Sequence, residues 1–204
     1  MEDSVIYIAL AIYDPSGSYS RHAGALIASV MDNTKSNVCF CVLHDDSLSA
    51  ANMDKLAKTA EKEGGLVKFV DVSRELKKLA DVINVKKLTG VFSPGTLFRL
   101  FVPEVVELDK IIYLDCDVIV NMDIKELWDI DLADCCIAAV GDLAVQSTWK
   151  KACTSSLSVR MKIMKISPNK YFNAGVSLLN LQQIRHDFDF LNGLNLLPAH
   201  WSSI

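Results

Sequence analysis

The sequence lacks several features that would point to a membrane, a secretory route or a nucleic acid. It has no run of eighteen apolar residues, so we expect no membrane-spanning helix. Its 21 basic residues are outnumbered by 25 acidic ones, and a formal charge of −4 does not suggest nucleic-acid binding. Residues 1–4 are acidic and lack the basic region of a secretory signal. These absences favour a cytoplasmic protein.

Cysteine and histidine patterns that hold metals or disulfides are also absent. The six cysteines include no C-x-x-C pair and lie in apolar or strand-like segments. Buried free thiols in a reducing compartment explain them better than disulfides or zinc ligands. The four histidines show no metal-ligand spacing either: His22, His44, His186 and His200.

What the sequence does contain is an alternation of strand-like and helix-like segments over 204 residues, half of them hydrophobic. This length can bury a sizeable core in a single α/β domain. Alternation of this kind predicts a mainly parallel, doubly wound sheet. Strands are expected at Val5–Ala11, Val38–Leu43, Leu66–Val70, Ile111–Val120, Cys135–Val140 and Ala174–Leu179, and helices at Tyr19–Met31, Leu48–Glu63, Ser73–Ala80 and Ser93–Leu100, with a break near Pro103.

The apolar segment Ile111–Val120 is the most informative, because two carboxylates interrupt it one residue apart. Burying an unpaired carboxylate costs several kcal/mol, so something cationic is expected nearby. If the strand continues that far, Asp115 and Asp117 lie on one face, and two hard oxygen donors suit Mg²⁺ or Mn²⁺. The alternative is that the strand ends at Asp115 and enters a turn, where aspartate is common.

Two blocks of sequence carry a family resemblance. They are Y-L-D-C-D-V-I-V, followed by D-I-K-E-L-W-D-I-D-L, and, about fifty residues later, Y-F-N-A-G-V-S-L-L-N-L. Together they closely resemble glycosyltransferase family 8, which includes bacterial lipopolysaccharide galactosyl- and glucosyltransferases and glycogenin. The resemblance runs from Ile6 to about Arg185. It implies a Rossmann-like GT-A fold in which residues 1–204 form one nucleotide-sugar-binding domain.

The resemblance implies how the two aspartates are used. Members of the family hold Mn²⁺ or Mg²⁺ on this pair, and the metal bridges the diphosphate of a UDP-sugar. By that match Asp115 and Asp117 bind metal, and Asp115 also lies near the ribose. Cys116 belongs to the same donor-binding segment, and we expect its side chain to be an inward-packed spacer rather than a nucleophile.

The resemblance also assigns the loop after the first strand to the uracil and the ribose. The corresponding stretch here runs from Ala9 to Tyr19, and it places Ala9, Asp14 and Tyr19 against the donor. This loop is longer than in most of the family. On the residues alone, the Asp14-Pro15-Ser16-Gly17 segment can instead be a simple turn.

Three further residues match donor-site positions of the family. Arg99, in an otherwise apolar helix, corresponds to an arginine that reaches the sugar-phosphate region, although a salt bridge to a nearby carboxylate would also explain it. Asp142 corresponds to an aspartate that accepts hydrogen bonds from the donor sugar. Asn173 corresponds to an asparagine at the same sugar, but before Ala-Gly it can also shape a tight turn; Gly175 then permits close backbone approach.

The end of the chain departs from the family pattern. The motif H-x-x-G-x-x-K-P-W, which supplies a histidine ligand to the metal, does not occur. The D-Q-D-x-L-N block is either shortened to Asp187-Phe188-Asp189 or absent, and we favour absence. In both cases the glutamine beside the anomeric carbon is missing, so we expect the usual C-terminal portion to be lacking.

The resemblance implies a metal-dependent, retaining transfer of glucose or galactose from a UDP-sugar to a saccharide or glycolipid hydroxyl in bacterial cell-envelope synthesis, such as that of lipopolysaccharide. For a complete protein it also implies peripheral association with the inner face of the cell membrane. The alternative is a nucleotide-sugar-binding domain with little or no transferase activity. A nucleotidyltransferase would also use paired aspartates, but the loop after the first strand lacks its glycine-rich, basic character.

Overall fold

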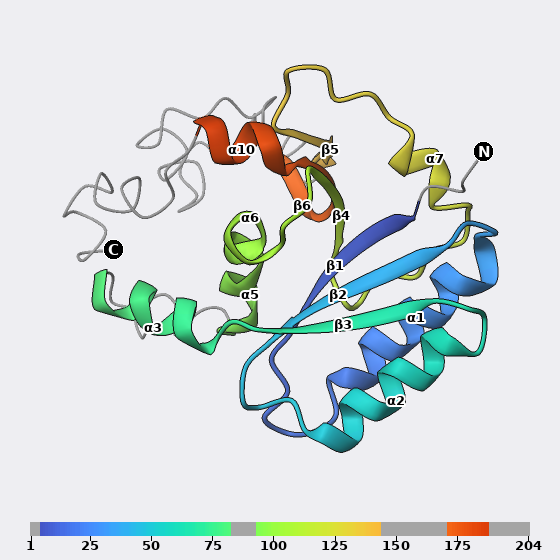
Figure 1. Ribbon diagram of the computed structural model, residues 1–204, viewed down its shortest axis with the longest axis vertical. Helices are drawn as coiled ribbons and strands as arrows, with labels where there is room; N and C mark the ends of the chain where they lie inside the picture. Colours follow the sequence, from blue (N-terminus) through green and yellow to red (C-terminus); the bar gives the residue numbers. More distant parts are fainter. Residues whose placement is uncertain (1–4, 83–92, 144–170, 188–204) are drawn as a thin grey trace.

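The computed structural model describes residues 5–82, 93–143 and 171–187, which form one mixed sheet with helices on both faces (Figure 1). The strand order is β3-β2-β1-β4-β6-β5. The strands are β1 (Ile6–Ile12), β2 (Val38–His44), β3 (Leu66–Asp71), β4 (Lys110–Leu114), β5 (Ile137–Gly141) and β6 (Phe172–Asn180). The helices are α1 (Ser20–Asn33), α2 (Ala50–Glu61), α3 (Ser73–Val82), α5 (Gly95–Phe98), the 3₁₀ helix η1 (Arg99–Phe101), α6 (Val102–Val105), α7 (Lys125–Trp128) and α10 (Leu181–Asp187).

The direction of chain progression reverses between β1 and β4. Strands β1, β2 and β3 follow one another outward in parallel, and β4 then returns to pair in parallel with the other side of β1. Strand β6 is antiparallel to both β4 and β5. Open α/β sheets bind ligands beyond the carboxyl ends of their strands at such a reversal, so the loops after β1 and β4 are where a ligand is expected.

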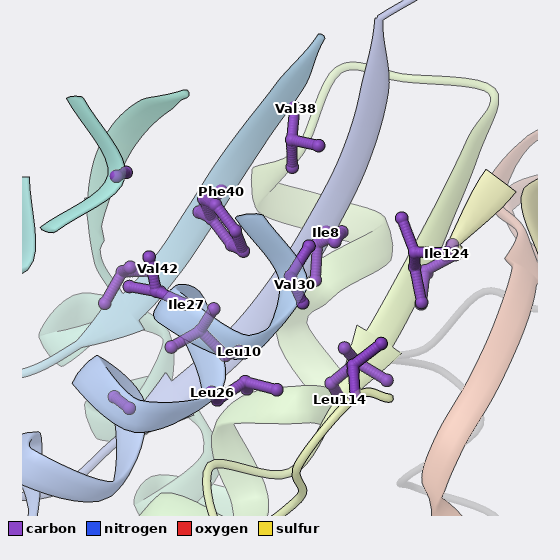
Figure 2. Close-up of a cluster of buried hydrophobic side chains, with 14 of the residues drawn as sticks. Ile8, Leu10, Leu26, Ile27, Val30, Val38, Phe40, Val42, Leu114 and Ile124 are labelled. Carbon is purple, nitrogen blue, oxygen red and sulfur yellow. The ribbon is translucent and has the colours of Figure 1, made fainter. Parts of the chain in front are cut away.

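Each face of the sheet buries its own hydrophobic cluster. On one face, Ile8 and Leu10 of β1 pack with Leu26, Ile27 and Val30 of α1 (Figure 2). On the other face, Ala9 and Ala11 pack with residues of α5, η1, α6 and α10, which are Phe98, Phe101, Val102 and Leu181. The alternation of side chains along β1 explains this division, because neighbouring residues of a strand point to opposite faces.

The structure confirms most of the predicted elements and corrects two. The segment expected as one strand over Ile111–Val120 is a strand only to Leu114. The helix beginning near Ser93 changes to 3₁₀ geometry at Arg99, before Pro103, which lies in the first turn of α6, where a proline costs little. The sheet is mainly parallel, as predicted, and β6 runs antiparallel to its neighbours, a direction that strand patterning cannot reveal. None of the helices within the described residues is long and apolar enough to cross a membrane.

Candidate functional site

Most of the predicted site residues gather at one end of the sheet, where β1, β4 and β5 end and β6 begins. The amide of Asp115, just after β4, donates to the carbonyl oxygen of Gly175 at 2.8 Å. The amide of Asp142, just after β5, donates to the carbonyl oxygen of Tyr171 at 3.0 Å. Main-chain hydrogen bonds therefore continue past the ends of β4 and β5, and they hold the segments after these two strands beside the start of β6.

Asp115 is fixed by two donors on a single carboxylate oxygen. Arg99 Nη2 lies 2.7 Å from Asp115 Oδ1, and the hydroxyl of Tyr113 lies 3.1 Å from the same atom. The Arg99 and Asp115 side chains are 22% and 31% exposed, so the pair is only partly shielded from solvent. Arg99 thus forms the salt bridge that the sequence allowed as an alternative role. The carboxylate that it pairs with belongs to Asp115, one of the two predicted metal ligands.

Arg99 is itself firmly held. Its Nε donates to the carbonyl of Thr96 at 3.2 Å, and its Nη1 donates to the carbonyl of Ala174 at 3.0 Å. The guanidinium also lies 4.8 Å from the centre of the Tyr113 ring. Arg99 therefore joins the α5–η1 segment to β6 and to Asp115, and it stands as a fixed part of the site.

The D-x-D segment forms a turn in which the two aspartates have different surroundings. The amide of Val118 donates to the carbonyl of Asp115 at 3.2 Å, which closes the turn. Asp117 is exposed and makes no hydrogen bond or ion pair with any residue in the described ranges. The alternative that the sequence left open, a strand ending in a turn, is therefore the structure observed, and it leaves the Asp117 carboxylate accessible.

Cys116 is an inward-packed spacer, as expected. Its side chain is buried in the core, and its thiol donates to the carbonyl of Ala11 at 3.2 Å. Burial, together with the neighbouring Asp115 and Asp117 charges, raises the pKa of Cys116 to about 12. The thiol stays protonated at neutral pH, so only its main chain is left to take part in ligand binding.

Asp14 is buried, and its carboxylate is occupied by the protein itself. Asp14 Oδ1 accepts a hydrogen bond from the Tyr19 amide at 2.7 Å, while Oδ2 accepts one from the Ser20 amide at 3.2 Å. Asn52 Nδ2 of α2 lies 3.3 Å from Oδ2. Asp14 therefore satisfies the otherwise unpaired N–H groups at the start of α1. A contact between this carboxylate and a donor nucleotide stays a prediction.

Tyr19 lies near the aspartate turn. Burial and the nearby Cys116, Asp117 and Asp115 raise the pKa of its hydroxyl to about 12, with Arg99 acting in the opposite direction. The hydroxyl is thus protonated at neutral pH and can donate a hydrogen bond. Tyr19, in the loop after β1, is therefore close enough to the turn after β4 to interact with its charges, although the two segments are far apart in the sequence.

Ala9 is not among the residues that the structure brings to this end of the sheet, and its contact with a donor stays a prediction. Ala9 lies in the middle of β1, is completely buried and pairs with Tyr113 of β4 in register. Strand β1 continues to Ile12, so the loop at the end of the sheet starts at Tyr13. The side chain of Ala9 instead packs in the cluster that includes Phe98 of α5.

Asn173 and Gly175 shape the strand that faces Asp115. Asn173 Oδ1 accepts a hydrogen bond from the Gly175 amide at 2.8 Å, which is the turn-shaping role that the sequence allowed. A Cβ on Gly175 would lie 2.8 Å from Asp115 Oδ2 and 3.0 Å from Asn173 Oδ1. Glycine is therefore required for close approach, while a contact from Asn173 or Asp142 to a donor sugar stays a prediction.

The donor set at this end of the sheet fits a divalent cation in part. Asp115 and Asp117 supply hard carboxylate oxygens of the kind that Mg²⁺ and Mn²⁺ prefer. Within the described residues, no group of three or more His, Cys, Asp or Glu could hold a metal ion. Two protein ligands with the remaining positions filled by phosphate and water is a common arrangement for Mg²⁺.

Sequence reasoning missed Tyr113. Its hydroxyl contacts Asp115, and its ring lies against Arg99. In the sequence pattern, however, Tyr113 looks like an ordinary apolar residue of the strand. The signal available was its spacing: residues i and i+2 of a strand share a face, so a tyrosine two residues before an aspartate can reach it.

Comparisons with known proteins agree with this geometry. The family model described as glycosyl transferase family 8 matches residues 11–188. General stress protein A of Bacillus subtilis (strain 168) is 26% identical over 98% of this chain, which covers 64% of that protein. The lipopolysaccharide 1,2-glucosyltransferase of Escherichia coli (strain K12) is 29% identical over 84% of this chain and 47% of its own length.

Solved structures give the same result. The galactosyltransferase LgtC, determined in complex with donor and acceptor sugar analogs, has a TM-score of 0.68 and 28% identity over 91% of this chain and 60% of its own. The apo structure of the bifunctional glycosyltransferase WbbM has a TM-score of 0.73 with 24% identity, over 98% of this chain and 35% of its own. This chain thus spans roughly half to two thirds of the curated relatives named above. The chain has the GT-A fold and belongs to glycosyltransferase family 8.

Proposed function

We propose that this chain binds a UDP-sugar through a divalent cation and serves the transfer of a glucose or galactose unit to a saccharide hydroxyl with retention of configuration. The observation that carries the proposal is the aspartate turn after β4, where Asp115 is anchored and Asp117 is exposed at the reversal point of the sheet. Family membership adds to it, because the match includes this turn.

Asp115 and Asp117 are the residues that would hold Mn²⁺ or Mg²⁺. When bound, the cation stabilises the negative charge that develops on the departing diphosphate. Arg99 supports the same charge: each of its two terminal nitrogens makes one hydrogen bond to the protein and has a second N–H. Those N–H groups can donate to phosphate oxygens without breaking the contacts that fix the side chain.

The remaining predicted residues would surround the nucleoside and the sugar. The loop from Tyr13 to Tyr19 lies where the uracil and ribose are expected, with the protonated Tyr19 hydroxyl as a donor. Asp142 and Asn173 would accept and donate hydrogen bonds at the sugar. Cys116 is buried and protonated, so it is not available as a nucleophile. The route that we propose is attack on the same face as the departing phosphate.

The acceptor belongs to the proposal as well. The name of the Escherichia coli relative, a lipopolysaccharide 1,2-glucosyltransferase, supports a cell-envelope saccharide as the acceptor class. A transfer assay with UDP-glucose and UDP-galactose distinguishes a working enzyme from a domain that only binds the donor. Donor binding without sugar transfer would support a binding domain.

The first test is a thermal-shift titration with UDP, with and without Mn²⁺, and with GDP for comparison. A ligand at a hundredfold excess over its dissociation constant stabilises the folded state by about 2.7 kcal/mol. We expect Mn²⁺-dependent stabilisation by UDP and its loss in Asp117→Ala. Asp134→Ala is the matched control, because Asp134 is also exposed but precedes β5 and so lies toward the opposite end of the sheet.

Two results would contradict the proposal. Equal stabilisation by UDP with and without Mn²⁺ would remove the metal from donor binding. Equal loss in Asp117→Ala and Asp134→Ala would show that the effect of Asp117 is not local to the aspartate turn.

A further inference from the structure

The two oxygens of the Asp115 carboxylate have different surroundings. Oδ1 accepts one hydrogen bond from the Arg99 guanidinium and one from the Tyr113 hydroxyl. Oδ2 accepts no hydrogen bond from any residue in the described part of the chain and lies beside Gly175, where a Cβ would come within 2.8 Å of it. The protein thus saturates one oxygen and leaves the other uncommitted.

Tyr113 is well placed to maintain this difference. It is the second-last residue of β4, its side chain is 2% exposed, and it belongs to the core cluster on the α5–α6 face of the sheet. Its neighbours Leu114 and Cys116 belong to the cluster on the opposite face. The alternation of the strand therefore brings the hydroxyl of a rigidly packed ring to the side chain two residues ahead.

We propose that Tyr113 is a positioning residue, whose hydroxyl holds Asp115 Oδ1 so that Oδ2 is the oxygen presented to the divalent cation. This inference rests on the proposed function, since it assigns a supporting residue to the same metal site. Partners that orient a ligating carboxylate typically change metal affinity by about 10- to 100-fold when they are removed.

Arg99 alone would not give the same result. One guanidinium contact to Oδ1 leaves the carboxylate able to rotate about its Cβ–Cγ bond, because terminal torsions of this type are broad. A second donor, arriving from a buried ring, restricts that rotation. Loss of the hydroxyl should thus loosen the carboxylate while leaving the ion pair and the ring packing in place.

The test is Tyr113→Phe, which removes only the hydroxyl and keeps the ring under Arg99. Calorimetric titration with UDP should give an affinity about tenfold weaker in the presence of Mn²⁺, and unchanged in its absence. Tyr7→Phe is the matched control, because Tyr7 lies near the start of β1 with its ring beside Trp128. Melting temperatures of both variants, measured without ligand, report whether folding is affected.

Crystal structures of the wild type and of Tyr113→Phe give a second readout that does not depend on nucleotide binding. We expect the Asp115 carboxylate to be rotated or spread over several orientations in the variant. A carboxylate that keeps its wild-type orientation in Tyr113→Phe would overturn the inference, even if the wild type binds no UDP. A UDP affinity that is weakened equally with and without Mn²⁺ in Tyr113→Phe would also overturn the inference. If the wild type shows no Mn²⁺-dependent UDP binding, the proposed function is overturned instead.

Discussion

Asp14 illustrates how a single buried carboxylate can organise a loop. Burial raises its pKa, but hydrogen bonds from the Tyr19 and Ser20 main chain and from Asn52 lower it by more, and the pKa ends below the ordinary value of 3.8. A carboxyl group with a lowered folded-state pKa stabilises the protein above its unfolded-state pKa. That contribution is lost as the pH falls through the folded-state pKa.

We therefore expect Asp14→Asn to lower the free energy of unfolding at pH 7 by about 1 kcal/mol, because the amide keeps one acceptor oxygen but loses the charge and the second acceptor that bind the Tyr19 and Ser20 N–H groups. The difference from the wild type should begin to shrink below about pH 4, where the carboxyl group of the unfolded chain takes up a proton, and should keep shrinking as the pH falls through the lower folded-state pKa. Urea denaturation at pH 7 and at pH 3 measures both effects, with the exposed Asp46→Asn as the control. A difference that stays constant across this range would contradict the assigned role of the charge.

Single residues of the site differed in how well the sequence could predict them. Asp115 and Asp117 could be singled out because charge inside an apolar segment needs a reason. The burial of Ala9 could not be foreseen, because local sequence does not reveal where β1 ends. Tyr113 was missed because its contribution is one hydroxyl contact with a neighbour, and that contact depends on the rotamers of both side chains.

Among the helices, α1 carries a glycine that the packing does not require. A Cβ on Gly24 would lie 3.8 Å from Leu56 Cδ2 of α2, which is an ordinary contact distance. A Cβ on Gly65, just before β3, would lie 2.9 Å from Met31 Sδ and 3.2 Å from the carbonyl oxygen of Ala60. The two glycines thus differ in whether a methyl group fits.

Gly24→Ala should stabilise the protein by about 1 kcal/mol, because alanine has the higher helix propensity. In a domain of this size that corresponds to a rise in melting temperature of about 2–4 °C. Gly65→Ala, in the same assay, should give no gain. Stabilisation by both substitutions would show that Met31 and the chain around Ala60 yield more easily than the packing indicates.

Strands and helices were predicted well where pattern alone decides, and less well where partners decide. The apolar residues Val118, Ile119 and Val120 suggested that β4 continues, but the turn between Asp115 and Val118 ends it. The direction of β6 depends on the path that returns it to β4. Residues 144–170, which precede that strand, lie outside the described residues.

At the scale of the whole molecule, the described residues bury two hydrophobic clusters on opposite faces of one sheet. Phe40 of β2 is completely buried in the cluster that contacts α1, and Phe98 of α5 is completely buried in the other. The backbone of the sheet stands between the two clusters. Changes to one cluster should therefore leave the other nearly unaffected.

Phe40→Leu and Phe98→Leu should each destabilise the protein by about 1 kcal/mol, and their effects should add in the double variant to within about 0.5 kcal/mol. Chemical denaturation of the two single variants and the double variant measures this. A larger coupling energy would mean that the strands transmit packing changes from one face to the other.

The hydrogen bond from the Asp115 amide to the Gly175 carbonyl has a consequence for how the protein is made. During synthesis, β1 to β4 leave the ribosome well before β6, and pairings distant in sequence form slowly. Until β6 arrives, the aspartate turn lacks both that carbonyl and the Ala174 carbonyl that Arg99 uses. The nascent protein would thus complete its sheet and the contacts of the aspartate turn in one late event.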